Sequence, residues 1–375
     1  MIDRRYFRYF DWINFILTLT LLAIGLLFVF SSTYSPQMPF SKYFSKQLFG
    51  AISGIFIYFL FCLMDLRKVD RQGYLAYFFT LILLVYTFLN GFIGMGAKRW
   101  MSLYFFSFQP SELTKLFLPI FLAYYFNEQY LPNSGINNFS RNSFKSKFKE
   151  YIFPLIIILI SFFLVLKQPD LGTAIIILIS GLTTLWIIGL EKKFFIFLGL
   201  SILICAPFLW QHLKTYQKQR ILVLLGEGDT RKERYQLEQS KIAVGSGGLS
   251  GKGFLKGTQN KFAFLPEDHT DFIFSVICEE WGFLGSLLII TLFSLLFIRF
   301  FYIAVNLPTL FEQIIATGLI CHLIPSVCIN IGMVIGILPI VGIPLPLISY
   351  GNTNLWVTMA SLGCLNNLSI RRFYY

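Results

Sequence analysis

A cluster of acidic residues runs directly into an apolar segment in Phe264-Leu-Pro-Glu-Asp-His-Thr-Asp-Phe-Ile-Phe-Ser-Val-Ile-Cys-Glu-Glu-Trp-Gly-Phe283. Such a junction places carboxylates at a membrane surface, where a side chain is partly removed from water and still reaches it. Ionisable side chains in this position are energetically costly and are often functional. Asp271 is therefore a candidate functional residue. Capping of the helix that follows is an equally open interpretation, because Asp is a favoured N-cap residue.

Composition places the whole chain among polytopic membrane proteins. Its 375 residues are 56% hydrophobic and only 13% charged, whereas about 25% of the residues of a soluble protein are charged. Mean hydropathy is +0.67, and several uncharged runs reach the roughly 20 residues that a helix needs to cross a bilayer. Strict alternation of apolar and polar residues is missing, which argues against a transmembrane barrel. We therefore expect an all-α polytopic membrane protein.

The net charge of +12 does not indicate a nucleic-acid partner. The basic residues are spread over many short loops and no basic domain collects them, so membrane orientation explains them better. The six cysteines all lie inside apolar runs, without paired or metal-type spacing. This placement is typical of small core or lipid-facing residues.

The apolar runs predict ten transmembrane helices in a single domain that covers residues 1–375. We expect them at about residues 11–31, 47–64, 73–92, 109–127, 151–167, 173–190, 194–213, 271–299, 312–337 and 348–369. Arginines precede the first run and follow the last, so both termini are expected on the cytoplasmic side. The polar linker 128–150 is expected to be cytosolic. Residues 214–270 would form one large extracytoplasmic loop, because long loops cross the membrane largely regardless of their charge.

Polar residues gather on the predicted outer side. They are Lys98, Arg99, Gln109, Ser111, Glu112, Lys115, Gln168, Asp170, Arg220, Gln239, Lys241, Glu267 and Asp271. Glu112 and Lys115 are three residues apart, so they share one helix face within the first two turns of a span. A partly buried ion pair there indicates function. A purely structural bridge between helices is the alternative.

A glycine-rich segment, Gly245-Ser-Gly-Gly-Leu-Ser-Gly-Lys-Gly253, resembles a phosphate loop but lacks its pattern. A Walker A motif needs Ser or Thr after the lysine, and the dinucleotide fingerprint needs a glycine where Ser250 stands. Backbone amides near Lys241 and Lys252 could still cradle a diphosphate. A flexible turn is the other open interpretation. The three histidines are far apart and predict no metal site, whereas Asp268 and Asp271 are candidate ligands for a hard cation.

Six strings in this order resemble the SEDS family (shape, elongation, division and sporulation) over nearly the whole chain. They are Gly96-Ala-Lys-Arg-Trp100, Phe108-Gln-Pro-Ser-Glu-Leu-Thr-Lys115, Gln168-Pro-Asp-Leu-Gly-Thr173, Gln239-Ser-Lys-Ile-Ala-Val-Gly-Ser-Gly-Gly248, Phe264-Leu-Pro-Glu-Asp-His-Thr-Asp-Phe-Ile-Phe274 and Leu345-Pro-Leu-Ile-Ser-Tyr-Gly351. Gly251-Lys-Gly253, Gly257-Thr-Gln259 and Gly342-Ile-Pro-Leu-Pro346 look more like the elongation branch, RodA, than the division branch, FtsW. The chain departs from the family at two places. Asn352 stands where the family usually has glycine, and the proline that usually follows Arg220 is missing.

The resemblance implies a peptidoglycan glycosyltransferase in the bacterial inner membrane. Such enzymes polymerise lipid II at its outer face during cell elongation and work with a class B penicillin-binding protein, which crosslinks the new strand. The family's essential Asp corresponds to Asp271, and its functional Glu and Lys correspond to Glu112 and Lys115. Contact with the partner is expected near the eighth and ninth spans.

We expect inverting glycosyl transfer with release of undecaprenyl diphosphate. Asp271 is the predicted general base, Lys115 orients the attacking hydroxyl or stabilises charge, and Glu112 holds Lys115. The other predicted substrate-binding residues are Arg99, Gln109, Ser111, Asp170, Arg220, Gln239 and Lys241. Arg99, Arg220 and Lys241 are expected to neutralise the diphosphate, and a divalent cation, Mg or Mn, is expected to share that task. A lipid II flippase and a noncatalytic scaffold for the partner synthase are the alternatives.

Overall fold

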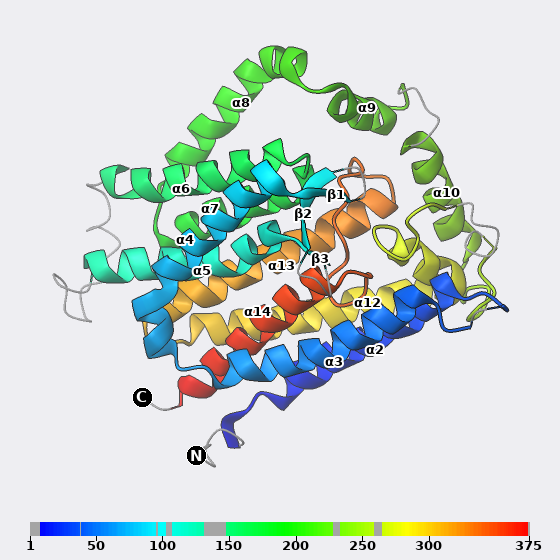
Figure 1. The fold of residues 1–375 in the computed structure, drawn as a ribbon, viewed down its shortest axis with the longest axis horizontal. Coiled ribbons are helices and arrows are strands. Elements are labelled where there is room, and N and C mark those ends of the chain that lie inside the picture. The colour runs from blue at the N-terminus through cyan, green and yellow to red at the C-terminus, as the bar shows by residue number, and fades with distance from the viewer. Residues whose placement is uncertain are drawn as a thin grey trace.

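The computed structural model describes residues 8–37, 39–94, 97–102, 107–130, 148–227, 233–258 and 265–373. It is a bundle of long helices packed side by side (Figure 1). They are α2 (Trp12–Thr33), α3 (Lys42–Leu63), α4 (Leu66–Asn90), α5 (Pro110–Tyr130), α6 (Phe148–Lys167), α7 (Leu171–Ile188), α8 (Lys192–His212), α12 (Ile273–Val305), α13 (Leu310–Val334) and α14 (Asn352–Arg371). Both chain ends lie at the same end of the bundle. Gly96, Gln259, Phe264 and most of the linker 128–150 lie outside the described residues.

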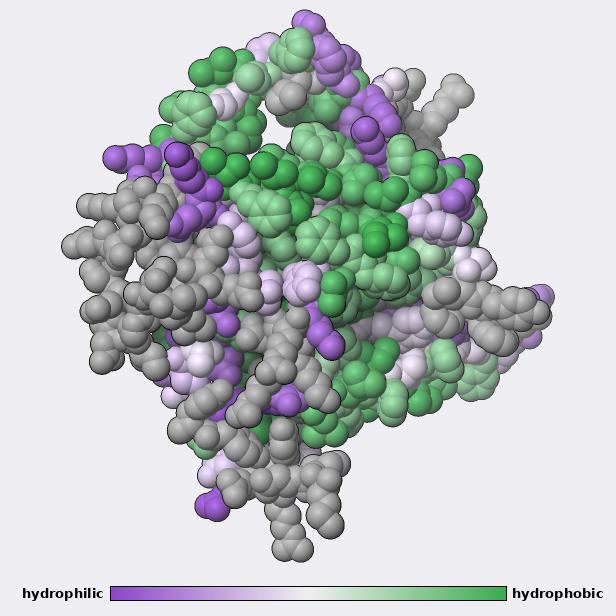
Figure 2. All heavy atoms as spheres, turned by 60° about the vertical axis from the view of Figure 1, so that its left-hand side comes forward, coloured by the Kyte–Doolittle hydropathy of each residue, from purple (hydrophilic) through white to green (hydrophobic). Residues whose placement is uncertain are grey.

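Seven helices of the described chain are long and apolar enough to cross a membrane, judged by length and composition alone. They are α2, Gln72–Asn90 of α4, Lys149–Lys167 of α6, and α3, α7, α12 and α13. The surface supports a membrane setting, because hydrophobic side chains cover much of one face (Figure 2). In lipid, exposed apolar side chains have no reason to be buried, so such a surface is stable there. The chain is therefore a multi-pass membrane protein.

Two long helices outside this set, α5 and α14, lie inside the bundle. α14 packs against α3, and α5 packs against α4 and α13. Most of α14 after its first turn is buried, so its asparagines contact protein rather than lipid. A helix that other helices surround can carry polar residues because partner groups satisfy their hydrogen bonds. Their lower hydropathy leaves α5 and α14 outside the set of seven, although the sequence predicts a span at each of them.

A small antiparallel sheet connects α4 to α5, which the all-α prediction misses. Its strands are β1 (Phe92–Gly94), β2 (Ala97–Ser102) and β3 (Ser107–Phe108), in the order β1-β2-β3. Phe92 pairs with Trp100, and Met101 pairs with Phe108. These strands are too short for their alternation to stand out in the sequence. The sheet matters for the site because β2 carries Arg99.

The segment between α8 and α12 forms two further helices, α9 (Thr215–Leu224) and α10 (Glu233–Ser246), and a glycine-rich turn. This turn is fixed against a kink in α12, where Gly282 has a φ of 65° and a ψ of −160°. The amides of Lys252 and Gly253 donate to the carbonyls of Glu279 and Glu280, at 3.0 and 2.9 Å. These hydrogen bonds argue against a flexible turn, and they take up two of the amides that a diphosphate cradle near Lys252 would use.

Two adjacent carboxylates of α12 hold the same segment from below. Oε1 of Glu279 lies 2.6 Å from Nζ of Lys252 and accepts hydrogen bonds from the amide and the hydroxyl of Thr258, both at 2.8 Å. Glu280 accepts a hydrogen bond from the hydroxyl of Ser31 in α2. Both carboxylates are buried. They therefore have structural partners, as buried charges require.

Candidate active site

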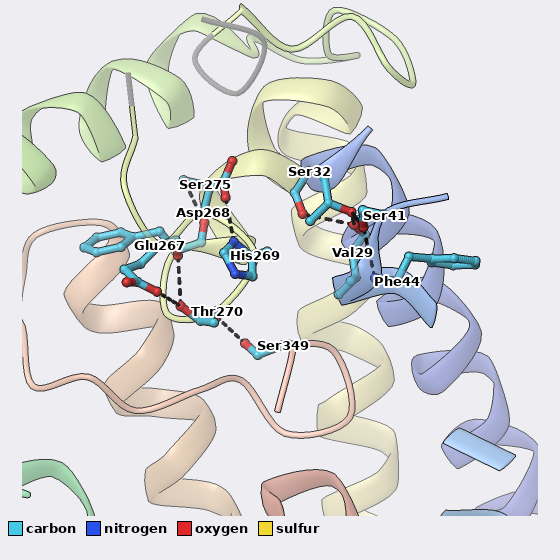
Figure 3. Close-up of polar contacts among 12 residues, drawn as sticks. Val29, Ser32, Ser41, Phe44, Glu267, Asp268, His269, Thr270, Ser275 and Ser349 are labelled. Carbon is cyan, nitrogen blue, oxygen red and sulfur yellow. Dashed lines mark hydrogen bonds and ion pairs between the residues drawn. The ribbon is translucent and has the colours of Figure 1, made fainter. Parts of the chain in front are cut away.

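A tight turn places Asp271 directly before α12. The hydroxyl of Thr270 donates to the carboxylate of Glu267 at 3.0 Å, and the hydroxyl of Ser349 donates to the carbonyl of Thr270 at 2.6 Å. Figure 3 shows Glu267, Thr270 and Ser349 joined in this way. Glu267 has a φ of +58°, a conformation that non-glycine residues adopt only at a cost. The turn is therefore held in one shape by side chains from both sides.

The carboxylate of Asp271 is partly exposed and has no hydrogen-bond partner among the described residues. The N-cap position of α12 belongs to Phe272, and no side chain caps it. The capping interpretation of Asp271 is therefore wrong. Its main-chain carbonyl accepts a hydrogen bond from Asn330 of α13 at 2.9 Å. The residue is fixed through its backbone, and its carboxylate stays available.

The surroundings of Asp271 favour a proton acceptor. The pKa of its carboxyl group is raised to about 6, because burial and then the charge of Glu267 raise it more than Arg99 and Arg220 lower it. At neutral pH the group is ionised and is a stronger base than an ordinary aspartate. Such a pKa, close to the working pH, suits general base catalysis. Because both arginines lower the pKa of Asp271, they lie within electrostatic reach of its carboxylate.

Asp170 holds Arg99 in position through an ion pair. Its Oδ1 lies 3.0 Å from a terminal guanidinium nitrogen of Arg99, and its Oδ2 accepts hydrogen bonds from Gln109 at 2.6 Å and Ser111 at 3.3 Å. Asp170 also caps α7, because Oδ1 accepts from the amide of Thr173. These neighbours occupy both oxygens of the carboxylate. Asp170 therefore positions Arg99 and the start of α5, and Gln109 and Ser111 complete this support.

The predicted pair in α5 forms a buried ion pair. Nζ of Lys115 lies 2.6 Å from Oε2 of Glu112, and the two residues are only 3% and 4% exposed. The same oxygen accepts a hydrogen bond from Asn354 of α14 at 3.1 Å. Sequence analysis missed Asn354. The one signal in the sequence that could have found it is an asparagine side chain in a segment that has no charged residues.

Other predicted residues make their described contacts elsewhere. Gln239 and Lys241 belong to α10, and none of the hydrogen bonds or ion pairs of the described residues joins either to Asp271. The side chain of Lys241 is exposed and lies against Gly336, because a Cβ built on that glycine would be 2.0 Å from Cε. Nζ of Lys98 donates to the carbonyl of Leu89 at 2.7 Å. The charge that accompanies Asp271 comes from Arg99 and Arg220 instead.

The departure at Asn352 has a local explanation. This residue is the first of α14, where helical backbone angles suit any residue. Its side chain faces α3 at Gly50, since a Cβ on Gly50 would lie 2.3 Å from Oδ1 of Asn352. The asparagine fits because position 50 is glycine.

Comparison with known proteins gives a match to the FtsW/RodA/SpoVE family of cell cycle proteins over residues 11–373. The chain belongs to this family. It is 42% identical over 301 residues to the peptidoglycan glycosyltransferase MrdB of Escherichia coli K12, covering 79% of this chain and 77% of that protein. It is 33% identical over 379 residues to MrdB of Helicobacter pylori 26695, covering 100% and 93%. The resemblance to the SEDS family is thus confirmed.

Solved structures show the same fold. One chain from a structure described as "Structural coordination of polymerization and crosslinking by a peptidoglycan synthase complex" has a TM-score of 0.80 and 27% identity, covering 98% of this chain and 99% of that one. The rod shape determining protein RodA of Thermus thermophilus has a TM-score of 0.70 and 27% identity, covering 97% and 98%. These relatives favour the RodA branch of the family, as the sequence strings predict.

Proposed function

We propose that this chain is a peptidoglycan glycosyltransferase of the elongation type, which polymerises lipid II and releases undecaprenyl diphosphate. Its relatives MrdB and RodA carry the name of this activity. The observation that carries the proposal is the carboxylate of Asp271, which is partly buried, without a hydrogen-bond partner among the described residues, and within electrostatic reach of two arginines. This combination offers a base and a counter-charge for a leaving diphosphate in one place.

The proposed reaction is a displacement with inversion. The 4-hydroxyl of a GlcNAc unit attacks the anomeric carbon of MurNAc on a second lipid-linked disaccharide. The new glycosidic bond forms as the bond from that carbon to the diphosphate oxygen breaks, and the bonding electrons leave with the diphosphate. The hydroxyl proton passes to Asp271, which is the general base because its raised pKa makes it a better acceptor than an ordinary carboxylate.

Arg99 and Arg220 are the proposed ligands of the diphosphate. A guanidinium group binds phosphate oxygens through two parallel hydrogen bonds, and a fixed positive charge stabilises the charge that develops on the leaving group. Asp170 keeps Arg99 in place. Lys115, held by Glu112 and Asn354, is the proposed group that orients the acceptor. We keep Gln239 and Lys241 as proposed contacts for more distant parts of the substrate.

A divalent cation at this site stays a proposal, and the described side chains restrict which residues could hold it. Within the described residues no group of three or more His, Cys, Asp or Glu side chains gathers to hold a metal. Asp170 is occupied by its own partners, and Asp268 lies 3.0 Å from His269. Asp268 uses only one oxygen for this contact, so a cation would be held by diphosphate oxygens together with Asp268 or Asp271, since Mg²⁺ commonly binds one or two carboxylates and substrate phosphates. Polymerisation in EDTA, with and without added Mg²⁺ or Mn²⁺, tests this.

The proposed membrane arrangement has ten spans in one domain, both termini in the cytoplasm and residues 214–270 outside. Supporting it, α9, α10 and the turn before α12 lie at the end of the bundle away from the chain ends (Figure 1). The arginines near both ends of the chain favour the cytoplasmic side. Asp271 would then meet lipid II at the outer face of the inner membrane.

The proposed partner is a class B penicillin-binding protein. One relative of similar fold was solved in a peptidoglycan synthase complex. α12 presents large exposed apolar side chains, such as Phe283, Leu284 and Ile298, which suit a partner helix in the bilayer. Contact near the eighth and ninth spans therefore stays part of the proposal.

Polymerisation of purified lipid II by the protein with its partner tests the function. Asp271→Asn should abolish glycan strands while keeping size and shape of the side chain. Asp65→Asn is the matched control, because Asp65 pairs with Arg371 near the other end of the bundle. Strands made by the folded Asp271→Asn protein at the wild-type rate would overturn the base role. Lipid II that crosses the membrane without polymerisation would favour a flippase.

A further inference from the structure

Three aromatic rings meet beside the turn that carries Asp271. The ring of His269 lies 4.5 Å from that of Tyr43 and 5.6 Å from that of Tyr350, and the two tyrosine rings are 5.4 Å apart. They come from three separate segments: the start of α3, the turn before α12 and the loop before α14. We call Tyr43, His269 and Tyr350 the aromatic platform. Tyr43 is 47% exposed, so the platform presents ring surface to the outside of the protein.

The main chain fixes this platform to the candidate catalytic turn. The amide of Tyr350 donates to the carbonyl of His269 at 2.9 Å. Gln47 of α3 is buried and bridges the loop before α14: its Nε2 donates to the carbonyl of Ser349 at 3.1 Å, and its Oε1 accepts from the amide of Gly351 at 3.2 Å. The rings are thus held in place by backbone contacts, which a binding surface needs if little entropy is to be lost on binding.

Polar groups lie at the edge of the same rings. Nδ1 of His269 is 3.0 Å from Oδ1 of Asp268 (Figure 3). This contact uses Nδ1 of the imidazole, so Nε2 is the ring nitrogen left to meet a ligand. Among the described residues Nε2 has no hydrogen-bond partner. Asp268 keeps lone pairs beyond the one that faces His269.

Apolar ring faces beside hydrogen-bond acceptors match the chemistry of a sugar ring. A pyranose has faces of C–H groups, which pack on the electron-rich face of an aromatic ring, and hydroxyls at its edge, which donate to acceptors. Small-molecule sites commonly combine aromatic walls with a few placed polar groups. An aromatic residue that only anchors the protein at the membrane interface would need no connection to the catalytic turn.

The platform and the arginines come from different parts of the fold. Tyr43 belongs to α3, which packs against α14, whereas Arg99 belongs to β2, which packs against α4 and α5. In Figure 1, α3 runs along one edge of the bundle and α9, which carries Arg220, lies at the opposite edge. The leaving diphosphate belongs with the arginines. The rings come from separate elements and are free to serve the sugar whose hydroxyl Asp271 deprotonates.

We propose that Tyr43, His269 and Tyr350 form a carbohydrate subsite that stacks on the acceptor sugar and presents its hydroxyl to Asp271. The proposal rests on the proposed glycosyltransferase function and deepens it by assigning the acceptor side. His269 stands two residues before Asp271 in the same turn, so their Cα atoms are at most about 7 Å apart. The base therefore belongs to the same turn as one ring of the platform.

Binding of a saccharide without turnover tests the subsite. The full chain carries Asp271→Asn and is placed in lipid nanodiscs, and the probe is the free GlcNAc–MurNAc disaccharide, which has neither lipid nor diphosphate. Saturation-transfer NMR measures its dissociation constant. Tyr43→Leu and Tyr350→Leu should each raise that constant about tenfold, the effect of losing one aromatic contact. Tyr43→Phe keeps the ring and should bind as the parent protein does.

The matched control is Tyr34→Leu. Tyr34 is also an exposed tyrosine, at the end of α2, but its ring contacts Phe30 instead of the platform. It should leave binding unchanged. In the chain with Asp271 intact, Tyr43→Leu should raise KM for lipid II and leave kcat nearly unchanged.

Two outcomes overturn the subsite: no saturable binding of the disaccharide, or equal binding by the parent and both leucine variants. Equal binding would leave the tyrosines as interface anchors. Failure of the glycosyltransferase proposal looks different. In that case the disaccharide binds in a ring-dependent way, and the chain with Asp271 intact makes no strands with its partner.

Discussion

Asn354 of α14 donates a hydrogen bond to Oε2 of Glu112 in α5, the same oxygen that holds Lys115. Asn354 and Glu112 are 242 positions apart in the sequence. A buried carboxylate that accepts several hydrogen bonds is better compensated for its loss of water. The contact therefore joins the last helix of the bundle to the candidate catalytic pair.

Loss of this contact should weaken the enzyme without unfolding it. Asn354→Leu removes one hydrogen bond to a charged group, which costs about 1.5–3 kcal/mol, and it loosens the position of Lys115. We expect the polymerisation rate to fall about tenfold and the melting temperature to fall by a few degrees. Asn306→Ala is the control, because Asn306 is exposed and its side chain bonds to the carbonyl of Tyr302 one helical turn away. Equal rates for Asn354→Leu and the wild type would contradict this role.

Glu112 and Lys115 should be strongly coupled in stability. Removing one partner of a buried pair leaves an uncompensated charge and costs about 3–5 kcal/mol, whereas replacing both is often much less harmful. We expect Glu112→Gln and Lys115→Met each to lower the melting temperature more than the double variant does. Polymerisation should be lost in all three. A double variant that is as unstable as the sum of the two single ones would show that the pair is not coupled.

The pKa of Asp271 predicts that ionisation of this carboxylate, which the base role requires, lowers the stability of the fold. The folded-state pKa is about 6 and the ordinary value is 3.8, so the folded protein binds this proton more tightly than the unfolded chain does. Ionisation therefore costs stability as pH rises between these two values, and the cost is fully present above the higher one. Asp271→Asn should melt at a higher temperature than the wild type at pH 7.5, and the difference should vanish near pH 4.

The same pKa fixes the acid limit of the reaction. The wild-type rate should fall about tenfold for each pH unit below the pKa of the base, which is about 6 in the free protein.

A melting temperature of Asp271→Asn that stays below that of the wild type at every pH would contradict the cost of ionisation.

Two neighbours should move the acid limit in opposite directions. Glu267 raises the pKa of Asp271 and Arg99 lowers it. Glu267→Gln should therefore shift the acid limb of kcat/KM to lower pH, and Arg99→Gln should shift it to higher pH. Arg99→Gln should also raise KM, because it removes a proposed diphosphate ligand. Shifts in the same direction for both variants would show that the limb belongs to another group.

The glycine-rich turn should tolerate a methyl group at one glycine and not at another. Gly251 has a φ of +77°, and a Cβ there would lie 2.1 Å from the carbonyl oxygen of Glu280. Gly251→Ala should cost about 1–3 kcal/mol from backbone strain alone and lower the yield of folded protein. Gly245 lies in α10, and a Cβ there meets nothing within 4 Å, so Gly245→Ala is the matched control and should keep stability. Equal melting temperatures would contradict the fixed turn.

The sequence alone determined the helices, because apolar runs of sufficient length leave a chain in lipid no other way to pair its backbone. α2 to α8 and α12 to α14 follow these runs closely. It also indicated the pairing of Glu112 with Lys115, since a separation of three residues is local on a helix. Motif strings indicated the family, which the match over residues 11–373 confirmed.

Only the tertiary structure decided which distant side chains meet. The sequence grouped Lys241 with the arginines, but α10 carries it to Gly336, whereas Arg99 and Arg220 reach Asp271. It offered capping as a role for Asp271, and the helix begins after that residue with no side-chain cap. The bond from Asn354 to Glu112 depends on how α14 packs against α5, and the meeting of Tyr43 with His269 depends on how α3 lies beside the turn before α12. Local spacing fixes the contacts within one helix, while contacts between helices depend on packing geometry that no short stretch contains.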